Sequence, residues 1–360
     1  MQDFYAIIDL QHEEGMVSSQ PASHHKIFGR RVIDYMLRAL QQVSPRGVIA
    51  LVENSGFAQY LEDAAVPVVC KNRDMTSVQD IVDEYGKDQQ YLVMPGAVMF
   101  DVVDIVTALR EAARSGKNVI NIADAEGSGN VFVIKNRVDL ARAAKIVQER
   151  TNRGHMLGGV SIIDADNTYI GPDVKIGMDT TIYPGVTIEG ETSIGKNCVI
   201  GQGSHLVNMK IGSNVQILSS TCLDCEIGDN TTVGPYAFMR QGAAIGKDCR
   251  IGCFVELKNA TFGEGSKASH LSYIGDATFG KNVNLGCGAI TVNYDGKSKS
   301  QTVVEDDAFV GCNTNLIAPV TVGKGAFVAA GSTITDNVPQ CALAIARERQ
   351  TNKEGWAKGR

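Results

Sequence analysis

Residues 170–206 read IGPDVKIGMDTTIYPGVTIEGETSIGKNCVIGQGSHL, and an aliphatic residue occupies every sixth position. The aliphatic residues of this run are Ile170, Ile176, Ile182, Ile188, Ile194, Ile200 and Leu206. In a helix, which turns by about 100° per residue, sixth neighbours point in three different directions. In an extended chain, side chains at even spacings share one side, so these residues can form a single buried face.

The same period continues through most of the C-terminal half. After a slip of one residue it comprises Ile211, Ile217, Leu223, Ile227, Val233, Met239, Ile245, Ile251 and Leu257, and after a break over roughly residues 258–303 it comprises Val304, Val310, Leu316, Val322, Val328 and Ile334. Turn sequences such as Gly195-Lys196-Asn197 and Gly212-Ser213-Asn214 lie between these positions. Glycine and asparagine tolerate positive φ and turn the chain between short strands. A short fixed period with glycine-rich corners predicts a parallel β-helix.

Composition excludes several classes of protein. The net charge of −6 over 360 residues argues against a nucleic-acid binder, which needs clustered basic surface. No stretch approaches the roughly 18 apolar residues of a membrane span, and the N-terminus, residues 1–4, lacks the pattern of a signal peptide. The nine cysteines are scattered, and the single CxxC, Cys222 and Cys225, has no partner pair, so we expect no metal site. These features predict a cytoplasmic protein with reduced thiols.

The N-terminal third alternates between two patterns. The predicted strands are Tyr5–Leu10, Gly47–Val52, Val66–Lys71, Gln90–Met94, Val119–Ala123 and Val131–Lys135, and the predicted helices are Val32–Val43, Phe57–Ala64, Val78–Tyr85 and Val102–Ala113. Strands that alternate with helices indicate a mostly parallel sheet covered on both faces. Such a sheet binds ligands at the C-terminal ends of its strands. A further helix, from Arg137 to about Arg150, is predicted to connect this domain to the β-helix.

The segment after the first strand argues against phosphate binding. It reads Gln11-His12-Glu13-Glu14-Gly15, with two carboxylates and a single glycine. It therefore offers no nest of backbone N–H groups, and its negative charge repels a phosphate.

Several motifs in the C-terminal half resemble one family. They are Phe254-Val255-Glu256-Leu257-Lys258, the run GSKASHLSYIGD at residues 265–276, Asn293-Tyr294-Asp295-Gly296, Ala344-Ile345-Ala346-Arg347 and Lys353-Glu354-Gly355-Trp356. From about Tyr236 to Trp356 the chain is similar to the bacterial bifunctional N-acetylglucosamine-1-phosphate uridyltransferase/glucosamine-1-phosphate acetyltransferase. The resemblance implies a left-handed parallel β-helix, a homotrimer, and acetyl transfer from acetyl-CoA to the amine of glucosamine 1-phosphate.

The resemblance also implies roles for individual residues. His270 is the expected general base, oriented by Glu256. The residues expected to hold the phosphosugar are Arg240, Lys258, Tyr273, Asn284 and Lys299, and those expected against coenzyme A are Cys287, Asn293, Tyr294, Cys312, Ala330 and Arg347. Cys287 stands where the family has a small alanine, and Cys312 where it has a serine.

The N-terminal domain departs from the same family. Residues 7–16 lack the family's glycine-rich, arginine-bearing phosphate loop. The positions of its two magnesium ligands are occupied by Ala97 and Lys135. The expected organisation is thus a degenerate, shortened nucleotidyltransferase-like α/β domain at 1–136, a connecting helix and linker at 137–155, the β-helix at 156–341 and a tail at 342–360. We expect uridylyl transfer to be lost and no Mg²⁺ to bind at the degenerate site.

The residue types suit acetyl transfer. An amine that attacks a thioester must lose a proton, and histidine titrates close to neutral pH. Cys312 also raises an acetyl-cysteine mechanism, but no histidine adjoins Cys287 or Cys312 in the sequence, which favours direct attack by the amine. Three alternatives stay open: an acetyltransferase for another amino sugar or sugar nucleotide, a bifunctional enzyme that retains uridylyl transfer, and a non-catalytic trimer whose N-terminal domain binds a partner.

Overall fold

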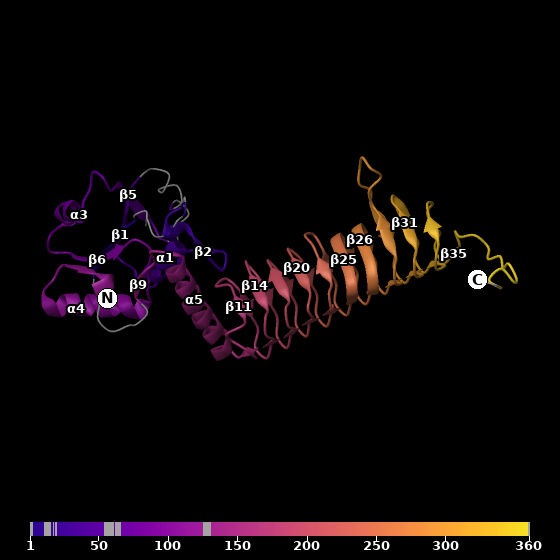
Figure 1. Ribbon diagram of the computed structural model, residues 1–360, viewed down its shortest axis with the longest axis horizontal. Helices are drawn as coiled ribbons and strands as arrows, with labels where there is room; N and C mark the ends of the chain where they lie inside the picture. The colour runs from indigo at the N-terminus through magenta and orange to yellow at the C-terminus, as the bar shows by residue number, and fades with distance from the viewer. Residues whose placement is uncertain are drawn as a thin grey trace. The chain divides into compact units, whose positions relative to one another are not determined.

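The computed structural model describes residues 3–10, 16, 18, 20–53, 61, 66–124 and 131–358. The chain divides into two compact units, Met1–Arg150 and Thr151–Arg360, which are described separately (Figure 1).

The first unit is built on a five-stranded parallel sheet. Its strands are β1 (Phe4–Asp9), β4 (Gly47–Val52), β5 (Val68–Asn72), β6 (Gln90–Pro95) and β8 (Val119–Asn121). The order β5-β4-β1-β6-β8 reverses direction between β1 and β6. In open parallel sheets, ligand sites lie outside the carboxyl ends of the strands at such a reversal.

Helices pack on this sheet as the apolar patterns predict. They are α1 (Val32–Val43), α3 (Val78–Tyr85) and α4 (Val102–Ser115), accompanied by the short helices η2 (Ala22–His24) and η3 (Ile122–Asp124). Two-stranded pairs are formed by β2 (Lys26–Ile27) with β3 (Arg30–Arg31), and by β7 (Val98–Met99) with β9 (Phe132–Val133). Val32, Met36 and Leu40 of α1 are buried in the core. The predictions for α1 and α3 are confirmed at both ends.

One predicted strand of the N-terminal unit lies outside the main sheet. The sixth predicted strand, 131–135, is wrong as a member of the parallel sheet, because β9 pairs antiparallel with β7 in a separate ribbon. Only two residues of that segment extend along β7, and so it adds no strand to the main sheet. The predicted helix Phe57–Ala64 and the loop at residues 11–15 fall almost wholly outside the described residues.

The connecting helix α5 (Arg137–Leu157) is longer than predicted. Asn136 Oδ1 accepts hydrogen bonds from the N–H groups of Val138 and Asp139, which caps its start. At the other end, Asn152 Nδ2 donates to the carbonyl oxygens of Ala165 and Thr168, and these bonds tie the last turns to the first coil of the second unit. Residues 151–157 thus continue the helix beyond the end predicted from the apolar pattern.

The second unit is a parallel β-helix of 26 short strands. In order they are β10 (Ser161–Ile162), β11 (Tyr169–Ile170), β12 (Lys175–Ile176), β13 (Thr181–Ile182), β14 (Thr187–Glu189), β15 (Ser193–Ile194), β16 (Val199–Ile200), β17 (His205–Val207), β18 (Lys210–Ile211), β19 (Gln216–Ile217), β20 (Thr221–Leu223), β21 (Glu226–Ile227), β22 (Thr232–Val233), β23 (Phe238–Met239), β24 (Ala244–Ile245), β25 (Arg250–Phe262), β26 (Lys267–Phe279), β27 (Asn284–Leu285), β28 (Ile290–Val292), β29 (Thr302–Val304), β30 (Phe309–Val310), β31 (Asn315–Ile317), β32 (Val320–Val322), β33 (Phe327–Val328), β34 (Thr333–Ile334) and β35 (Leu343–Ala344). Each of the early strands pairs with the strand three places later in the chain, as β10 does with β13, so three strands make one coil.

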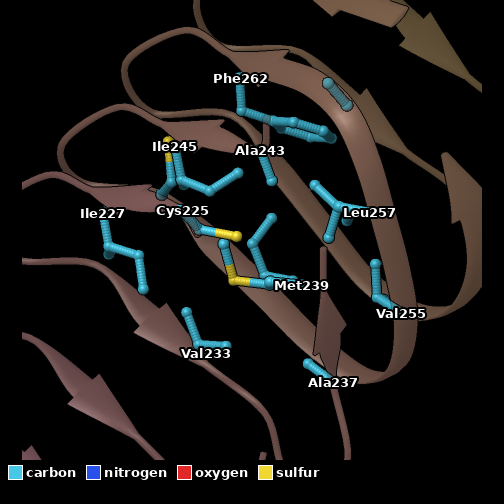
Figure 2. Close-up of a cluster of buried hydrophobic side chains, with 14 of the residues drawn as sticks. Cys225, Ile227, Val233, Ala237, Met239, Ala243, Ile245, Val255, Leu257 and Phe262 are labelled. Atoms are coloured by element: carbon cyan, nitrogen blue, oxygen red, sulfur yellow. The ribbon is translucent and has the colours of Figure 1, made fainter. Parts of the chain in front are cut away.

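The repeated aliphatic residues fill the interior of the coils. Figure 2 shows Ile227, Val233, Met239, Ile245 and Leu257 pointing into one such section of the core. The predicted fold class is therefore confirmed. The physical basis is the even spacing, which directs every sixth residue inward on successive strands.

Two details of the repeat differ from the sequence prediction. Leu223 does not hold an inward position: the register aligns Cys222 with Leu206 and Met239, and Cys222 is the buried residue. The expected break at 258–303 is also mostly absent, because the two 13-residue strands β25 and β26 continue the stack with Phe262 and Phe279 inside. Only one segment, between β28 and β29, leaves the stack as a loop. In β25 and β26, phenylalanine and small residues such as alanine take inward positions in place of aliphatic ones, and this hides the period of six.

The corners explain the glycine–x–asparagine pattern. Asn197 has a φ of 56°, so asparagine rather than glycine takes the left-handed conformation. Gly195 is required for space, because a Cβ there would lie 2.5 Å from the carbonyl oxygen of Gly212 in the next coil. Asn197 Nδ2 also donates to Asn214 Oδ1 at 3.4 Å. At this corner the backbone of one coil therefore lies directly against the backbone of the next.

We predict that Gly195→Ala lowers the free energy of unfolding of the second unit by about 1–3 kcal/mol, because the added methyl group meets backbone that is fixed by the neighbouring coil. The matched control is Gly154→Ala in α5, where a Cβ would meet nothing within 4 Å. This change should stabilise the helix by about 0.5–1 kcal/mol. Urea denaturation of both variants checks the pair, and equal stability of the two would contradict the close-approach argument.

Candidate active site

One corner of the β-helix places chemically distinctive residues in a column. The registers of β25, β26, β27, β30 and β33 bring Cys253, His270, Cys287, Cys312 and Ala330 to equivalent positions on successive coils. Each of them is followed by a residue of positive φ, which marks the same corner: Phe254, Leu271, Gly288, Asn313 and Gly331. We call Cys253, His270, Cys287, Cys312 and Ala330 the corner column.

His270 lies exposed in this column and touches one polar neighbour from the preceding coil. Its Nδ1 is 3.5 Å from Cys253 Sγ. When Nδ1 carries the hydrogen and faces the sulfur, Nε2 is the free base that points away from Cys253. Sequence reasoning missed Cys253, although its spacing of 17 residues from His270 is that of one coil in this region.

The column continues toward residues that the sequence predicts against coenzyme A. Asn313 N donates to Cys287 O at 2.8 Å, and Gly331 N donates to Cys312 O at 2.8 Å, which locks the three coils together. Strands stack about 4.8 Å apart, so His270 to Ala330 spans roughly 14 Å in a straight line. Arg347 lies beyond the end of this line, with its Cδ 3.9 Å from the position of a Cβ at Gly331.

A second group of predicted residues forms a cluster of positive charge. Arg240 and Lys258 occupy equivalent positions on adjacent coils, one residue after the paired Met239 and Leu257. The nearby ammonium of Lys299, through hydrogen-bonding contact and charge, and the charge of Arg240 lower the pKa of Lys258 below its ordinary value. When no anion is bound, three cations this close together repel one another, and this repulsion disfavours the protonated form of the lysines.

Glu256 and Tyr273 lie beside this cluster. Arg240 Nη1 donates to Glu256 Oε1 at 2.9 Å, and Glu256 is in register with Tyr273. The hydroxyl of Tyr273 reaches Gly275, where a Cβ would lie 2.5 Å from it. In this structure Glu256 thus bonds to Arg240. The expectation that Glu256 orients His270 stays a prediction. Asn284 sits half-buried on β27, on the strand that leads to Cys287.

Asp276 anchors the cationic cluster, and sequence reasoning did not single it out. Its carboxylate accepts hydrogen bonds from Asn259 Nδ2, at 2.7 Å, and from Asn293 Nδ2. Burial acts to raise the pKa of Asp276, but these hydrogen bonds and the charges of Lys299 and Lys258 hold the pKa below its ordinary value. The predicted coenzyme residue Asn293 is thereby fixed at the foot of the loop between β28 and β29.

That loop is a short hairpin which presents Lys299. Tyr294 and Lys299 form an antiparallel bridge, and the hydroxyl of Tyr294 donates to Gly296 O at 2.8 Å. Backbone N–H groups of Ser298 and Lys297 donate to Asp295 and lower the pKa of its carboxyl group. A cavity of 360 Å³ opens beside the hairpin, and its lining includes Lys299, Asp276, Asn259 and Gln301.

Within one chain these groups form two separate clusters. His270 and Gly275, the neighbour of Lys258, are five residues apart on β26, which corresponds to as much as roughly 16 Å. Positive φ values at Leu271 and Asp276 mark successive corners of the same face. The structure thus brings together His270 with part of the coenzyme set, and Arg240 with Lys258 and Lys299, at neighbouring corners, whereas Asn284 lies on β27 away from the other sugar-phosphate residues.

The carboxyl edge of the N-terminal sheet has a different character. Arg73 Nε donates to Asp9 Oδ1 at 2.6 Å, and Arg73 Nη1 lies 4.0 Å from Glu53 Oε1. Ala97 is fully buried and offers only a methyl group, while Lys135 is exposed. Among the described residues, no group of three or more His, Cys, Asp and Glu side chains is arranged to hold a metal ion.

Comparison with known proteins identifies the family. The family model of the bacterial transferase hexapeptide (six repeats) matches residues 173–208, 224–259 and 301–336. Bifunctional protein GlmU of Exiguobacterium sp. is 48% identical over 314 residues, which cover 82% of this chain and 68% of that protein. The GlmU of Halalkalibacterium halodurans is 42% identical over 325 residues, covering 85% and 70%. The chain belongs to the GlmU family.

Membership in the GlmU family makes the chain an enzyme of the hexapeptide acetyltransferase type. The match to the GlmU of Geobacillus sp. is 55% identical over 251 residues, 70% of this chain but only 55% of that relative. A substantial part of each relative therefore lies outside the matched region. Among the described residues, none of the helices combines the length and apolar character needed to cross a bilayer.

We predict that Lys299→Gln raises the pKa of Lys258 toward the ordinary lysine value, because it removes the cation that contributes most to the lowering. The control is Lys297→Gln, which neutralises a lysine on the same hairpin that does not contribute to the shift. NMR titration of the lysine side chains reports the pKa in each variant. An unchanged Lys258 titration in Lys299→Gln would mean that the two ammonium groups do not interact.

Proposed function

We propose that this chain transfers the acetyl group of acetyl-CoA to the amine of glucosamine 1-phosphate, in the supply of N-acetylglucosamine 1-phosphate for UDP-N-acetylglucosamine. The observation that carries the proposal is the corner column. It aligns a base, His270, with Cys287, Cys312 and Ala330, three of the positions at which the family resemblance implies coenzyme contacts. Membership in the GlmU family supports the same reaction.

His270 has the geometry of a general base for this reaction. Its exposed ring contacts Cys253 through Nδ1, and in the tautomer with the hydrogen on Nδ1 the free Nε2 takes up the proton that the substrate ammonium must lose before its amine attacks. The amine nitrogen then bonds to the thioester carbonyl carbon, and the carbon–sulfur bond breaks to release the coenzyme thiolate, which takes up a proton. The coils behind His270 are fixed by backbone hydrogen bonds, so the base is positioned before substrate arrives.

The cationic cluster is suited to the phosphate of the sugar. Arg240 offers a planar fork of donors, and Lys258 and Lys299 offer point charges. The lowered pKa of Lys258 reflects repulsion that a phosphate dianion would relieve. Tyr273 and Asn284 provide neutral hydrogen-bonding groups for sugar hydroxyls. Another amino sugar phosphate would use the same groups, so a panel of amino sugars with and without the 1-phosphate separates the substrates.

We propose that the active protein is a homotrimer. His270 and Lys258 lie at successive corners of one β-helix, so a single chain does not place its base beside its own cationic cluster. In a trimer, the corner column of one copy can face the cationic cluster of its neighbour. Exposed stacked aromatic pairs support such packing: Tyr236 with Phe254 at 5.5 Å and Phe309 with Phe327 at 4.4 Å between ring centroids. Light scattering of the active preparation should give three times 38.5 kDa. An active monomer would refute it.

We predict that His270→Ala lowers kcat by about 10²-fold or more with a small change in KM, because a general base acts in the transition state. Arg240→Ala and Lys258→Ala should mainly raise KM for the sugar phosphate. His205→Ala is the matched control, since His205 pairs with Glu189 on an earlier coil. Steady-state acetyl transfer across pH 6–9 measures all four. Normal turnover by His270→Ala would remove His270 from the mechanism.

We propose that the N-terminal unit no longer transfers uridylyl groups. Joining UTP to a sugar phosphate requires cations or Mg²⁺ to neutralise several negative charges. Among the described residues, this edge carries Asp9 and Glu53 in contact with Arg73, and a buried alanine occupies one predicted ligand position. Acetyl transfer does not use these groups, and the reaction is expected in the cytoplasm.

The purified chain should therefore acetylate glucosamine 1-phosphate and release no pyrophosphate from UTP and N-acetylglucosamine 1-phosphate, even with Mg²⁺ in excess. Both reactions are measured on the same preparation, and the acetyl transfer serves as the positive control. Mg²⁺-dependent release of pyrophosphate would show that the N-terminal unit retains the second activity and that the bifunctional alternative is correct.

A further inference from the structure

The nine cysteines, all in the described part of the chain, differ sharply in accessibility. Cys198, Cys222, Cys225 and Cys249 are buried in the β-helix, and burial raises the pKa of all four, that of Cys225 to about 11. A thiol must ionise to react, so these four are protected. The accessible thiols of the β-helix are Cys253, Cys287, Cys312 and Cys341.

Cys287 and Cys312 are neighbours in the corner column. The register of β27 with β30 aligns them on consecutive coils, and Asn313 N donates to Cys287 O at 2.8 Å. The two corners approach so closely that a Cβ at Gly286 would lie 2.5 Å from Cys312 N. Paired positions on adjacent strands are about 4.8 Å apart, which falls within the 4.4–6.8 Å range of Cα separations that a disulfide spans.

Both corners also have the same local conformation. Gly288 and Asn313, the residues that follow the two cysteines, have φ values of 77° and 53°. The two Cβ atoms therefore project in parallel from the stack. A small closure of the corner brings them to the roughly 3.5–4.5 Å that a disulfide requires between Cβ atoms.

The other accessible thiols are placed differently. Cys253 is separated from Cys287 by the whole coil that carries His270, a distance of about 9.5 Å between paired positions and beyond the limit of about 7 Å. Cys341 lies at another position, with its Sγ 3.5 Å from a Cβ placed at Gly325. Cys287 and Cys312 are thus the one accessible pair at neighbouring positions among the nine thiols.

We propose that Cys287 and Cys312 form an oxidisable dithiol, a modification site that a hydroperoxide converts into a disulfide. The exposed Cys312 thiolate attacks a peroxide oxygen, which breaks the O–O bond and gives the sulfenic acid and hydroxide. The half-buried Cys287 then attacks the sulfenic sulfur, and the S–O bond breaks with loss of water. In sum, two thiols lose two electrons and two protons, and one hydrogen peroxide is reduced to two waters.

The disulfide would close the acetyl-CoA positions of the column. Pulling the two corners together moves the backbone on which the coenzyme is proposed to lie, next to His270. The consequence for activity rests on the proposed acetyltransferase function, whereas the disulfide itself does not. A thiol reductant reverses the bond and restores the corner.

The test treats the 360-residue chain with hydrogen peroxide and maps its peptides under non-reducing conditions by mass spectrometry. We expect a Cys287–Cys312 cross-link and two fewer reactive thiols in the denatured protein, both reversed by dithiothreitol. Acetyl transfer should fall by about tenfold or more and recover on reduction, since small displacements of a positioned substrate carry large losses of rate. Cys312→Ser and Cys287→Ser should each abolish the cross-link, while Cys341→Ser, the matched exposed control, should form it and lose activity like the unmodified sequence.

The outcomes are distinguishable. A protein that acetylates glucosamine 1-phosphate but yields only sulfenic or sulfinic acid, or pairs Cys287 or Cys312 with another thiol, overturns the dithiol. A cross-link formed in a protein that acetylates no amino sugar supports the dithiol and overturns the proposed function. An active enzyme whose rate is unchanged by the cross-link would overturn the closure of the coenzyme track.

Discussion

The direct stacking of backbone on backbone at the corners governs the second unit. A Cβ at Gly195 would come within 2.5 Å of the next coil, and the side-chain amide of Asn197 bonds to that of Asn214 above it. Corners this close allow little variation in register from one coil to the next. Aliphatic side chains can then meet inside at every level, and buried apolar area supplies the main stabilising free energy. Side chains on the outer surface of the coils are aligned by the same register.

The candidate site is a consequence of that register. His270, Cys287, Cys312 and Ala330 are far apart in sequence, yet they line up because each precedes the residue of positive φ at one corner. A column of this kind is rigid, which suits the positioning of a thioester along it. The cationic cluster lies at the next corner, where Lys258 precedes Asn259 of positive φ and the loop between β28 and β29 places Lys299 beside Lys258. The two clusters face different directions on one chain, and this is the physical reason to expect neighbouring copies to complete the site.

The two units differ in the charged and reactive side chains that they present. The β-helix carries the candidate base His270, the cations Arg240, Lys258 and Lys299, and the corner column. In the N-terminal sheet, the described part of the carboxyl edge carries Arg73 in contact with Asp9 and Glu53. Stability and catalysis are separable here because the core residues lie inside the sheet and the reactive ones lie at its edge.

The sequence by itself determined the class of fold, most helix boundaries in the N-terminal unit, and the identity of the residues in the two clusters, because periodicity and motifs are local properties of the chain. It placed Leu223 inside where Cys222 belongs, broke the stack at residues 258–303, and missed Cys253 and Asp276. Those features depend on which residues come to lie on adjacent coils 17 or more positions away. Only the tertiary structure decided that Cys253 faces His270, that Glu256 holds Arg240, and that Cys287 lies beside Cys312, because coil length, and not sequence separation, sets which side chains meet.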